Sequence, residues 1–232
     1  MKGAPLDQHL ELREPCPLKN QGCPVVDELR RLKQEVKRLQ ALSNTDTLTG
    51  LFNFRYLLTA LEGEMERTRR TGLSTAFIMI DLDNFKRIND TYGHESGNRA
   101  LHWTSRIWRE NIRRIDIPCR YGGEEFAIIL PGARLPQAIR TAERLRALLV
   151  DSPVNLNNEL VRLTASFGVD AYRGRENLSV EAFIKRTDHF LLKAKAKGRN
   201  CVCYEEINTT IAPTEITDKE REALYATGRS AR

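Results

Sequence analysis

The stretch Arg120-Tyr-Gly-Gly-Glu-Glu-Phe126 lies between two β-like runs, Ile115–Tyr121 and Phe126–Leu130. Two glycines between such runs predict a tight β-hairpin, and glycine also lets a ligand approach the backbone closely. The carboxylates of Glu124 and Glu125 follow the turn directly. Their oxygens suit a hard cation such as Mg²⁺, which usually also binds substrate phosphates. Taken alone, the stretch fits a hairpin with solvated glutamates equally well.

A second group of carboxylates follows an apolar run. The run Leu73–Leu82 is predominantly apolar, but Asp81 lies near its end and Asp83 comes two residues later. A run of this length between Gly72 and a polar cluster predicts a buried strand. A carboxylate at the end of a buried strand is costly unless it is paired or bound to a metal. We therefore expect a strand-end aspartate and a hairpin glutamate to form one metal–triphosphate site, with Lys86 as a compensating charge.

The overall composition narrows the class of protein. Apolar residues make up 41% of the 232 residues, which is ordinary for a globular core in one or two domains. No apolar run approaches the roughly 20 residues that cross a membrane, and the N-terminus lacks the apolar core of a signal peptide. These patterns predict a cytoplasmic protein with no membrane partner.

The charges and cysteines exclude further classes. The net charge is +6, but acidic and basic residues are interspersed in Glu28–Arg38 and Glu62–Arg70, which disfavours a nucleic-acid partner. An anionic nucleotide ligand accounts for part of the positive charge equally well. The five cysteines form no evident disulfide framework, so we expect reduced thiols. Cys16 and Cys23 are either incidental thiols or, in a parallel dimer, four ligands of one Zn²⁺.

The N-terminal region changes pattern at residue 24. Residues 1–23 lack periodicity and are interpreted as an irregular arm. Residues 24–43 carry apolar side chains at alternating spacings of four and three, namely Val25, Leu29, Leu32, Val36 and Leu39. This seam predicts a short coiled-coil dimerisation helix, and the alternative is an amphipathic helix packed on its own domain. A seam this short is marginal alone, so the following domain must supply further dimer contacts.

The remainder, residues 44–205, is predicted to be one α/β domain, followed by a polar tail at 206–232. The breaker-rich segment Asn44–Gly50 marks its start. The spacing of apolar residues predicts four helices and two further strands: helices Phe54–Arg70, Glu95–Ile112, Pro136–Leu149 and Ser179–Lys197, and strands Leu160–Val169 and Cys201–Tyr204. Helices and strands alternate, while the hairpin makes the central sheet mixed.

Several spaced motifs in this domain resemble one family. They occur in a fixed order along the chain: Asp46-Thr-Leu-Thr-Gly-Leu-Phe-Asn53, Asp81–Asn98, Arg113-Arg-Ile-Asp116, the Gly-Gly-Glu-Glu-Phe hairpin, Leu163-Thr-Ala-Ser-Phe-Gly168 and Ala194–Asn200. Together they resemble the GGDEF-domain diguanylate cyclases, in the variant whose signature reads Gly-Gly-Glu-Glu-Phe. The resemblance implies a palm-like nucleotide cyclase fold.

The resemblance also implies a reaction. Such enzymes join two GTP molecules into cyclic di-GMP and release two pyrophosphates, as each 3′-hydroxyl attacks the α-phosphate of the other GTP. One domain holds one GTP, so two domains must meet in a homodimer. The coiled coil would raise the effective concentration of one half-site near its partner.

The family's functional positions map onto this sequence as follows. Two Mg²⁺ or Mn²⁺ ions would be held by Asp81, the carbonyl of Leu82 and Glu124, and would bind the triphosphate. The residues implied in GTP binding are Asp83, Asn84 and Phe85 through backbone N–H groups, Lys86, Lys195 and Arg199 through phosphate contacts, and Asn89, Asn98, Gly122 and Gly123. Catalysis is implied for Asp81, Lys86, Glu124 and Glu125, with Glu125 either a base or a residue that orients metal-bound water. For Lys195 and Arg199, complementing a helix dipole remains the alternative.

Asn98 departs from the family, which usually has Asp there. A carboxylate accepts from both N1–H and N2 of guanine, whereas an amide offers one acceptor and one donor. We hypothesise weakened guanine selectivity with some use of ATP. The alternative is that the Asn98 side chain reorients and the preference for GTP survives.

Arg113 and Asp116 match the family's Arg-x-x-Asp inhibitory site, where an intercalated dimer of cyclic di-GMP would be held by arginine and by a carboxylate. By itself this pattern is a common surface ion pair. Two rival functions stay open: an inactive cyclic di-GMP receptor that uses only this site, and a cyclase of relaxed specificity that makes cyclic GMP-AMP through Asn98.

Overall fold

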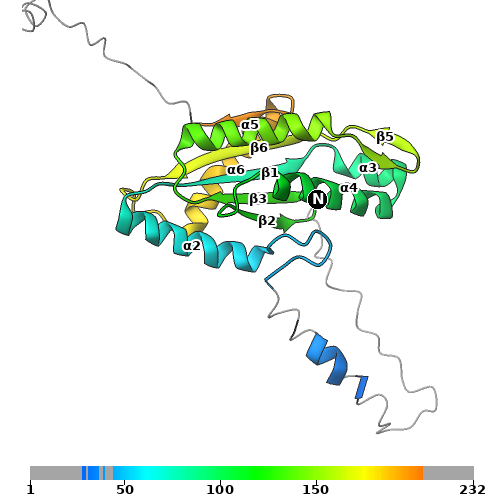
Figure 1. The fold of residues 1–232 in the computed structure, drawn as a ribbon, viewed down its shortest axis with the longest axis horizontal. Coiled ribbons are helices and arrows are strands. Elements are labelled where there is room, and N and C mark those ends of the chain that lie inside the picture. Colours follow the sequence, from blue (N-terminus) through cyan, green and yellow to red (C-terminus); the bar gives the residue numbers. More distant parts are fainter. Residues whose placement is uncertain (1–27, 30, 37–38, 40–43, 206–232) are drawn as a thin grey trace, which may run out of the picture.

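The computed structural model describes residues 28–29, 31–36, 39 and 44–205 (Figure 1). The expectations for the arm at 1–23 and the tail at 206–232 lie outside these residues. The predicted coiled coil at 24–43 lies outside them in part, and its described residues are helical. Four of its seam residues have half or more of their surface exposed: Leu29, Leu32, Val36 and Leu39.

The domain contains five helices and seven strands among its described residues. The helices are α2 (Phe54–Thr71), α3 (Phe85–Tyr92), α4 (His94–Glu110), α5 (Leu135–Asp151) and α6 (Val180–Ala196). The strands are β1 (Thr75–Leu82), β2 (Ile117–Gly122), β3 (Glu125–Leu130), β4 (Val154–Leu156), β5 (Glu159–Val161), β6 (Ala165–Tyr172) and β7 (Val202–Tyr204). None of these helices combines the length and apolar character needed to cross a membrane.

Five strands form the central sheet in the order β2-β3-β1-β6-β7. Strand β1 lies in the middle and pairs antiparallel with both β3 and β6, while β6 and β7 run parallel. The expected mixed sheet flanked by helices is therefore confirmed, with mostly antiparallel pairing. Strands β4 and β5 form a separate hairpin.

The helices cover both faces of this sheet because the side chains of its central strand alternate (Figure 1). Ile78 and Ile80 of β1 belong to the larger apolar cluster, with α4 and α5. Phe77 and Met79 belong to a second cluster, with α2 and α6. Within the larger cluster, Trp108 packs edge-on against two rings of the sheet, with its centroid 6.3 Å from that of Phe126. A strand buried on both faces explains the near-continuous apolar run seen in the sequence.

Three elements differ from the sequence expectations. The predicted strand Leu160–Val169 is divided into β5 and β6 by a short break. Helix α3 and strand β4 are additional. Helix α3 is eight residues long and only Phe85 is buried in it, so the helical repeat of apolar residues in its sequence is short.

A glycine brings helix α6 close to the sheet. A Cβ added at Gly168 of β6 would lie 2.4 Å from the backbone nitrogen of Leu191 and 2.5 Å from the carbonyl oxygen of Thr187. Both atoms belong to the backbone of α6, so only glycine permits this approach. The contact sets the distance between the sheet and helix α6, which carries Lys195 in its last turn.

Candidate active site

Carboxylates meet at one end of the central strands. Asp81, near the end of β1, is paired across the sheet with Glu125 at the start of β3. The N–H of Leu82 donates to the carbonyl of Glu124 at 3.3 Å, so the hairpin lies directly beside the end of β1. Lys195, in the last turn of α6, places its Nζ 2.7 Å from Oδ2 of Asp81. The predicted strand-end aspartate and hairpin glutamates are thus neighbours.

Several negative charges lie close together at this end of the sheet and are partly buried. Burial raises the pKa of Asp81 above its ordinary value, against the opposing effects of the hydrogen bond and charge of Lys195. Burial also raises the pKa of Glu125, and the negative charge of Asp81 adds to the rise. Asp188 and Glu124 contribute further to the repulsion at Glu125. A bound cation would relieve this excess of negative charge.

The donor atoms suit a hard divalent ion that shares its coordination with a substrate. Asp81 and Glu124 offer carboxylate oxygens and Leu82 offers a carbonyl, which is the chemistry that Mg²⁺ prefers. Within the residues that the structure describes, no three acidic, histidine or cysteine side chains converge as a complete metal cage. An ion held by two carboxylates and a carbonyl keeps positions for water and phosphate oxygens, and the residues present fit such an ion.

Asp83 has a structural role that the sequence did not indicate. The residue is 7% exposed, and its carboxylate accepts hydrogen bonds from Thr164 Oγ1, Ser166 Oγ and the Asn200 N–H at 2.8, 2.6 and 3.0 Å. Its own N–H donates to the carbonyl of Thr164 at 2.9 Å. This N–H is therefore already engaged within the domain, and its contact with phosphate stays a prediction, as do those of Asn84 and Phe85.

The other basic candidates lie around this end of the sheet. Arg199 follows α6, and its N–H donates to the Ala194 carbonyl at 3.1 Å in a left-handed conformation that reverses the chain. Burial raises the pKa of Asp81, and the positive charge of Arg199 offsets a small part of that rise. Lys86 is exposed in the first turn of α3. Lys195 and Arg199 thus both lie near enough to Asp81 for their charges to act on its carboxylate.

The two asparagines expected to contact the base lie where α3 meets α4. Asn89 rests against Gly97, where an added Cβ would lie 1.9 Å from its Oδ1. The next residue, Asn98, is exposed. Gly97 therefore makes room for the Asn89 side chain, a role that the sequence alone did not suggest.

The Arg-x-x-Asp segment borders a groove of about 530 Å³. The N–H of Arg113 donates to Oδ2 of Asp116 at 2.8 Å, and burial raises the pKa of Asp116 despite that bond. Arg109 and Arg114 also line the groove, beside an apolar wall that includes Phe52. The two added arginines were not identified from the sequence, although both lie within four residues of Arg113.

Asp188 is the acidic residue that sequence reasoning missed at the strand ends. It precedes Lys195 by seven residues on α6, which places both on one helix face. That spacing was the available signal.

Comparisons with known proteins identify the family. The family described as "Diguanylate cyclase, GGDEF domain" matches residues 43–201. The response regulator PleD of Caulobacter vibrioides is 41% identical over 173 residues, which cover 74% of this chain and 38% of PleD. The chain thus spans well under half the length of that curated relative.

Two solved structures have the same fold. Diguanylate cyclase SiaD of Pseudomonas aeruginosa, solved with its activator SiaC, superposes with a TM-score of 0.67 at 38% identity, over 78% of this chain and 70% of that one. The active GGEEF domain of a diguanylate cyclase from Vibrio cholerae gives a TM-score of 0.61 at 31% identity, over 66% of this chain and 96% of that one. On the extent of the family match and these identities, the chain belongs to the GGDEF-domain family of diguanylate cyclases.

Proposed function

We propose that this chain is a diguanylate cyclase that condenses two GTP molecules into cyclic di-GMP and two pyrophosphates within a homodimer. One observation carries the proposal. Lys195 lies 2.7 Å from Asp81 at the strand end that also presents Glu124 and Glu125. Opposite charges gathered in this way suit a metal-bound triphosphate, whose transfer chemistry depends on positioning and charge neutralisation.

Metal binding, phosphate binding and proton transfer would fall to different residues of the site. Asp81, the Leu82 carbonyl and Glu124 would hold two Mg²⁺ or Mn²⁺ ions. Such ions supply neutralisation of the triphosphate and a lowered pKa for the attacking 3′-hydroxyl. Lys195 would exchange its contact with Asp81 for one with phosphate, beside Arg199. Glu125 is paired with Asp81 across the sheet, and burial raises its pKa, so its carboxylate is a better proton acceptor than an ordinary glutamate.

Phosphate and base would be bound at the start of α3 and where α3 meets α4. The N–H groups of Asn84 and Phe85 open helix α3, where a phosphate is favoured, and Lys86 follows in the first turn. Gly122 and Gly123 leave the turn of the hairpin open to a ligand, because an added Cβ at either would meet no atom within 4 Å. Asn89 and Asn98 would contact the guanine edge.

A homodimer is required because one domain carries one such half-site. The exposed seam residues Leu29, Leu32 and Val36 suit a second copy of the same helix. The molar mass in solution, measured by light scattering, is expected to be that of a dimer. Leu32→Glu is expected to lower the specific activity most strongly at low protein concentration, and a wild type that is monomeric by light scattering at concentrations where it is active would refute the dimer.

Product inhibition would use the groove beside Arg113 and Asp116. Its three arginines and apolar wall suit a ligand with phosphates and stacked guanine rings. The carboxylate of Asp116 would accept from a guanine edge while keeping its bond from the Arg113 N–H.

The activity is tested by supplying Mg²⁺ with GTP, with ATP and with both, and identifying the products by mass. Cyclic di-GMP from GTP is expected, and Asp81→Asn should abolish it. Asp170→Asn is the matched control, because Asp170 is also a buried, ion-paired aspartate but lies at the opposite end of β6. An adenine-containing product would favour relaxed specificity through Asn98. No product from a folded dimer would favour the receptor function.

A further inference from the structure

The turn of the signature hairpin is held by a side chain that precedes it. Arg120 of β2 donates from Nε and Nη2 to the carbonyl of Gly123, at 3.0 and 2.7 Å. Gly123 has a φ of 46°, and the ladder between β2 and β3 is irregular between Arg120 and Gly122. Because no atom lies within 4 Å of where a Cβ of Gly122 or Gly123 would be, the turn lacks packing there that would fix its shape. The two bonds from Arg120 restrain the turn at Gly123, next to the 3.3 Å bond from the Leu82 N–H to the Glu124 carbonyl.

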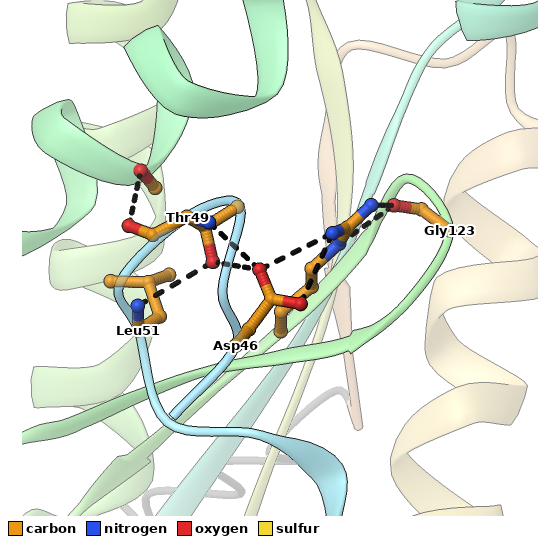
Figure 2. Close-up of polar contacts among 6 residues, drawn as sticks. Asp46, Thr49, Leu51 and Gly123 are labelled. Carbon is orange, nitrogen blue, oxygen red and sulfur yellow. Dashed lines mark hydrogen bonds and ion pairs between the residues drawn. The ribbon is translucent and has the colours of Figure 1, made fainter. Parts of the chain in front are cut away.

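The same guanidinium is anchored at its other edge by Asp46. Nη1 of Arg120 lies 3.2 Å from both carboxylate oxygens of Asp46 (Figure 2). Oδ1 of Asp46 also accepts from the N–H and the hydroxyl of Thr49, at 2.8 and 2.6 Å. Both side chains of the ion pair are largely buried, with 17% and 21% exposed, so this pair is screened less than a surface pair.

The loop that carries Asp46 is itself fixed to the domain. The Arg120 N–H donates to the Phe52 carbonyl at 2.8 Å, which joins the loop to the edge of β2. The Thr49 carbonyl accepts from Ser105 of α4 at 3.1 Å. Arg120 thus connects a rigid loop to an unpacked turn, and that turn leads directly into Glu124 and Glu125.

We propose that Arg120 and Asp46 are positioning residues for the cyclase reaction. The hydrogen bonds that run from Asp46 through the Arg120 guanidinium to the Gly123 carbonyl hold the hairpin carboxylates in position. This inference rests on the proposed function, and it concerns residues outside the implied metal, substrate and product sites. Neither side chain touches the reacting atoms. A displacement of about 1 Å at a reacting group can cost a hundredfold in rate, so a loosened turn is expected to affect turnover more than substrate affinity.

Three variants and one control test the proposal. Arg120→Gln removes the guanidinium and its hydrogen bonds. Arg120→Lys keeps the positive charge but cannot reach both Asp46 and the Gly123 carbonyl, and Asp46→Asn removes the negative charge that pairs with Arg120. Arg186→Gln is the matched control. Arg186 is another half-buried arginine with carboxylate partners, Asp170 and Glu176, far along β6 from the hairpin.

The expected result is a split between kinetic constants. Arg120→Gln should lower kcat by roughly ten- to a hundredfold and change KM for GTP by less than about threefold. Arg120→Lys should recover part of the loss. Amide hydrogen exchange in peptides that span residues 121–125 should speed up in Arg120→Gln and Asp46→Asn, but not in Arg186→Gln.

Other outcomes would overturn the proposal. These are an unchanged kcat, an equal loss of kcat in Arg186→Gln, a rise in KM alone, or hydrogen exchange at the turn that stays at the wild-type rate. Absence of product from the wild type would instead refute the proposed function, and the exchange measurement would still decide whether the pair holds the turn.

Discussion

Replacing Gly168 by alanine tests how closely helix α6 must approach the sheet. The new Cβ would lie 2.4 Å from the Leu191 nitrogen, 2.5 Å from the Thr187 oxygen and 2.9 Å from the Leu191 Cα. Ordinary contacts between such atoms are about 3.5 Å, so the helix must retreat by roughly 1 Å. Overpacking of this kind costs about 1–3 kcal/mol. Because the clashing atoms are backbone, no side-chain rotation relieves the overlap.

The assay is unfolding by urea and by heat. Gly168→Ala should lower the free energy of unfolding by about 2–3 kcal/mol and Tm by roughly 4–10 °C. The retreat of helix α6 should also shift Lys195 and lower turnover. Gly63→Ala in α2 is the matched control, since its Cβ would meet no atom within 4 Å, and it should stabilise by about 0.4–1 kcal/mol. A Gly168→Ala protein within about 0.5 kcal/mol of the wild type would refute the argument from close approach.

Three further predictions concern the candidate sites. Burial and the charge of Asp81 raise the folded-state pKa of Glu125 above its ordinary value of 4.5. Between these two pKa values the folded protein binds more protons than the unfolded chain does. The free energy of unfolding therefore falls as the pH rises through the window above 4.5. Without metal, Glu125→Gln should therefore raise Tm at pH 7 and have a smaller effect at pH 4; equal shifts at both would contradict this. Asn98→Asp should raise the GTP-to-ATP ratio of kcat/KM by roughly five- to a hundredfold, because one matched hydrogen bond is worth about 1–3 kcal/mol, and an unchanged ratio would remove Asn98 as a specificity determinant. Arg113→Ala should relieve inhibition by added cyclic di-GMP without loss of initial rate, and inhibition equal to that of the wild type would exclude this site.

Local patterns in the sequence were sufficient for most of the framework. The apolar run through Ile80 predicts the central strand, and the two glycines before Glu124 predict the hairpin, because both signals lie within a few neighbouring residues. The helix predicted from Ser179 is α6, and Ser179 caps it by accepting a hydrogen bond from the Ala182 N–H at 3.2 Å. Short elements such as α3 escaped notice, since few of their side chains are buried.

The contacts that shape the site were not predictable in the same way. Asp46 and Arg120 are separated by 74 residues, and Asp83 and Asn200 by 117. Such pairs come into contact only once the order of the strands in the sheet is set, and no periodicity in the sequence predicts these contacts. The family resemblance implied roles for Asp81, Lys195 and the Asp83 N–H, but it could not show that this N–H donates to Thr164.

The three hydrogen bonds accepted by Asp83 have a consequence for the energetics of the site. They join the end of β1, the start of β6 and the turn after α6 through one buried carboxylate. These segments are therefore ordered by folding itself, and the conformational entropy of arranging them is lost before any nucleotide arrives. A substrate that binds there needs little reorganisation of the surrounding dipoles, so more of its interaction energy remains to lower the barrier of the reaction.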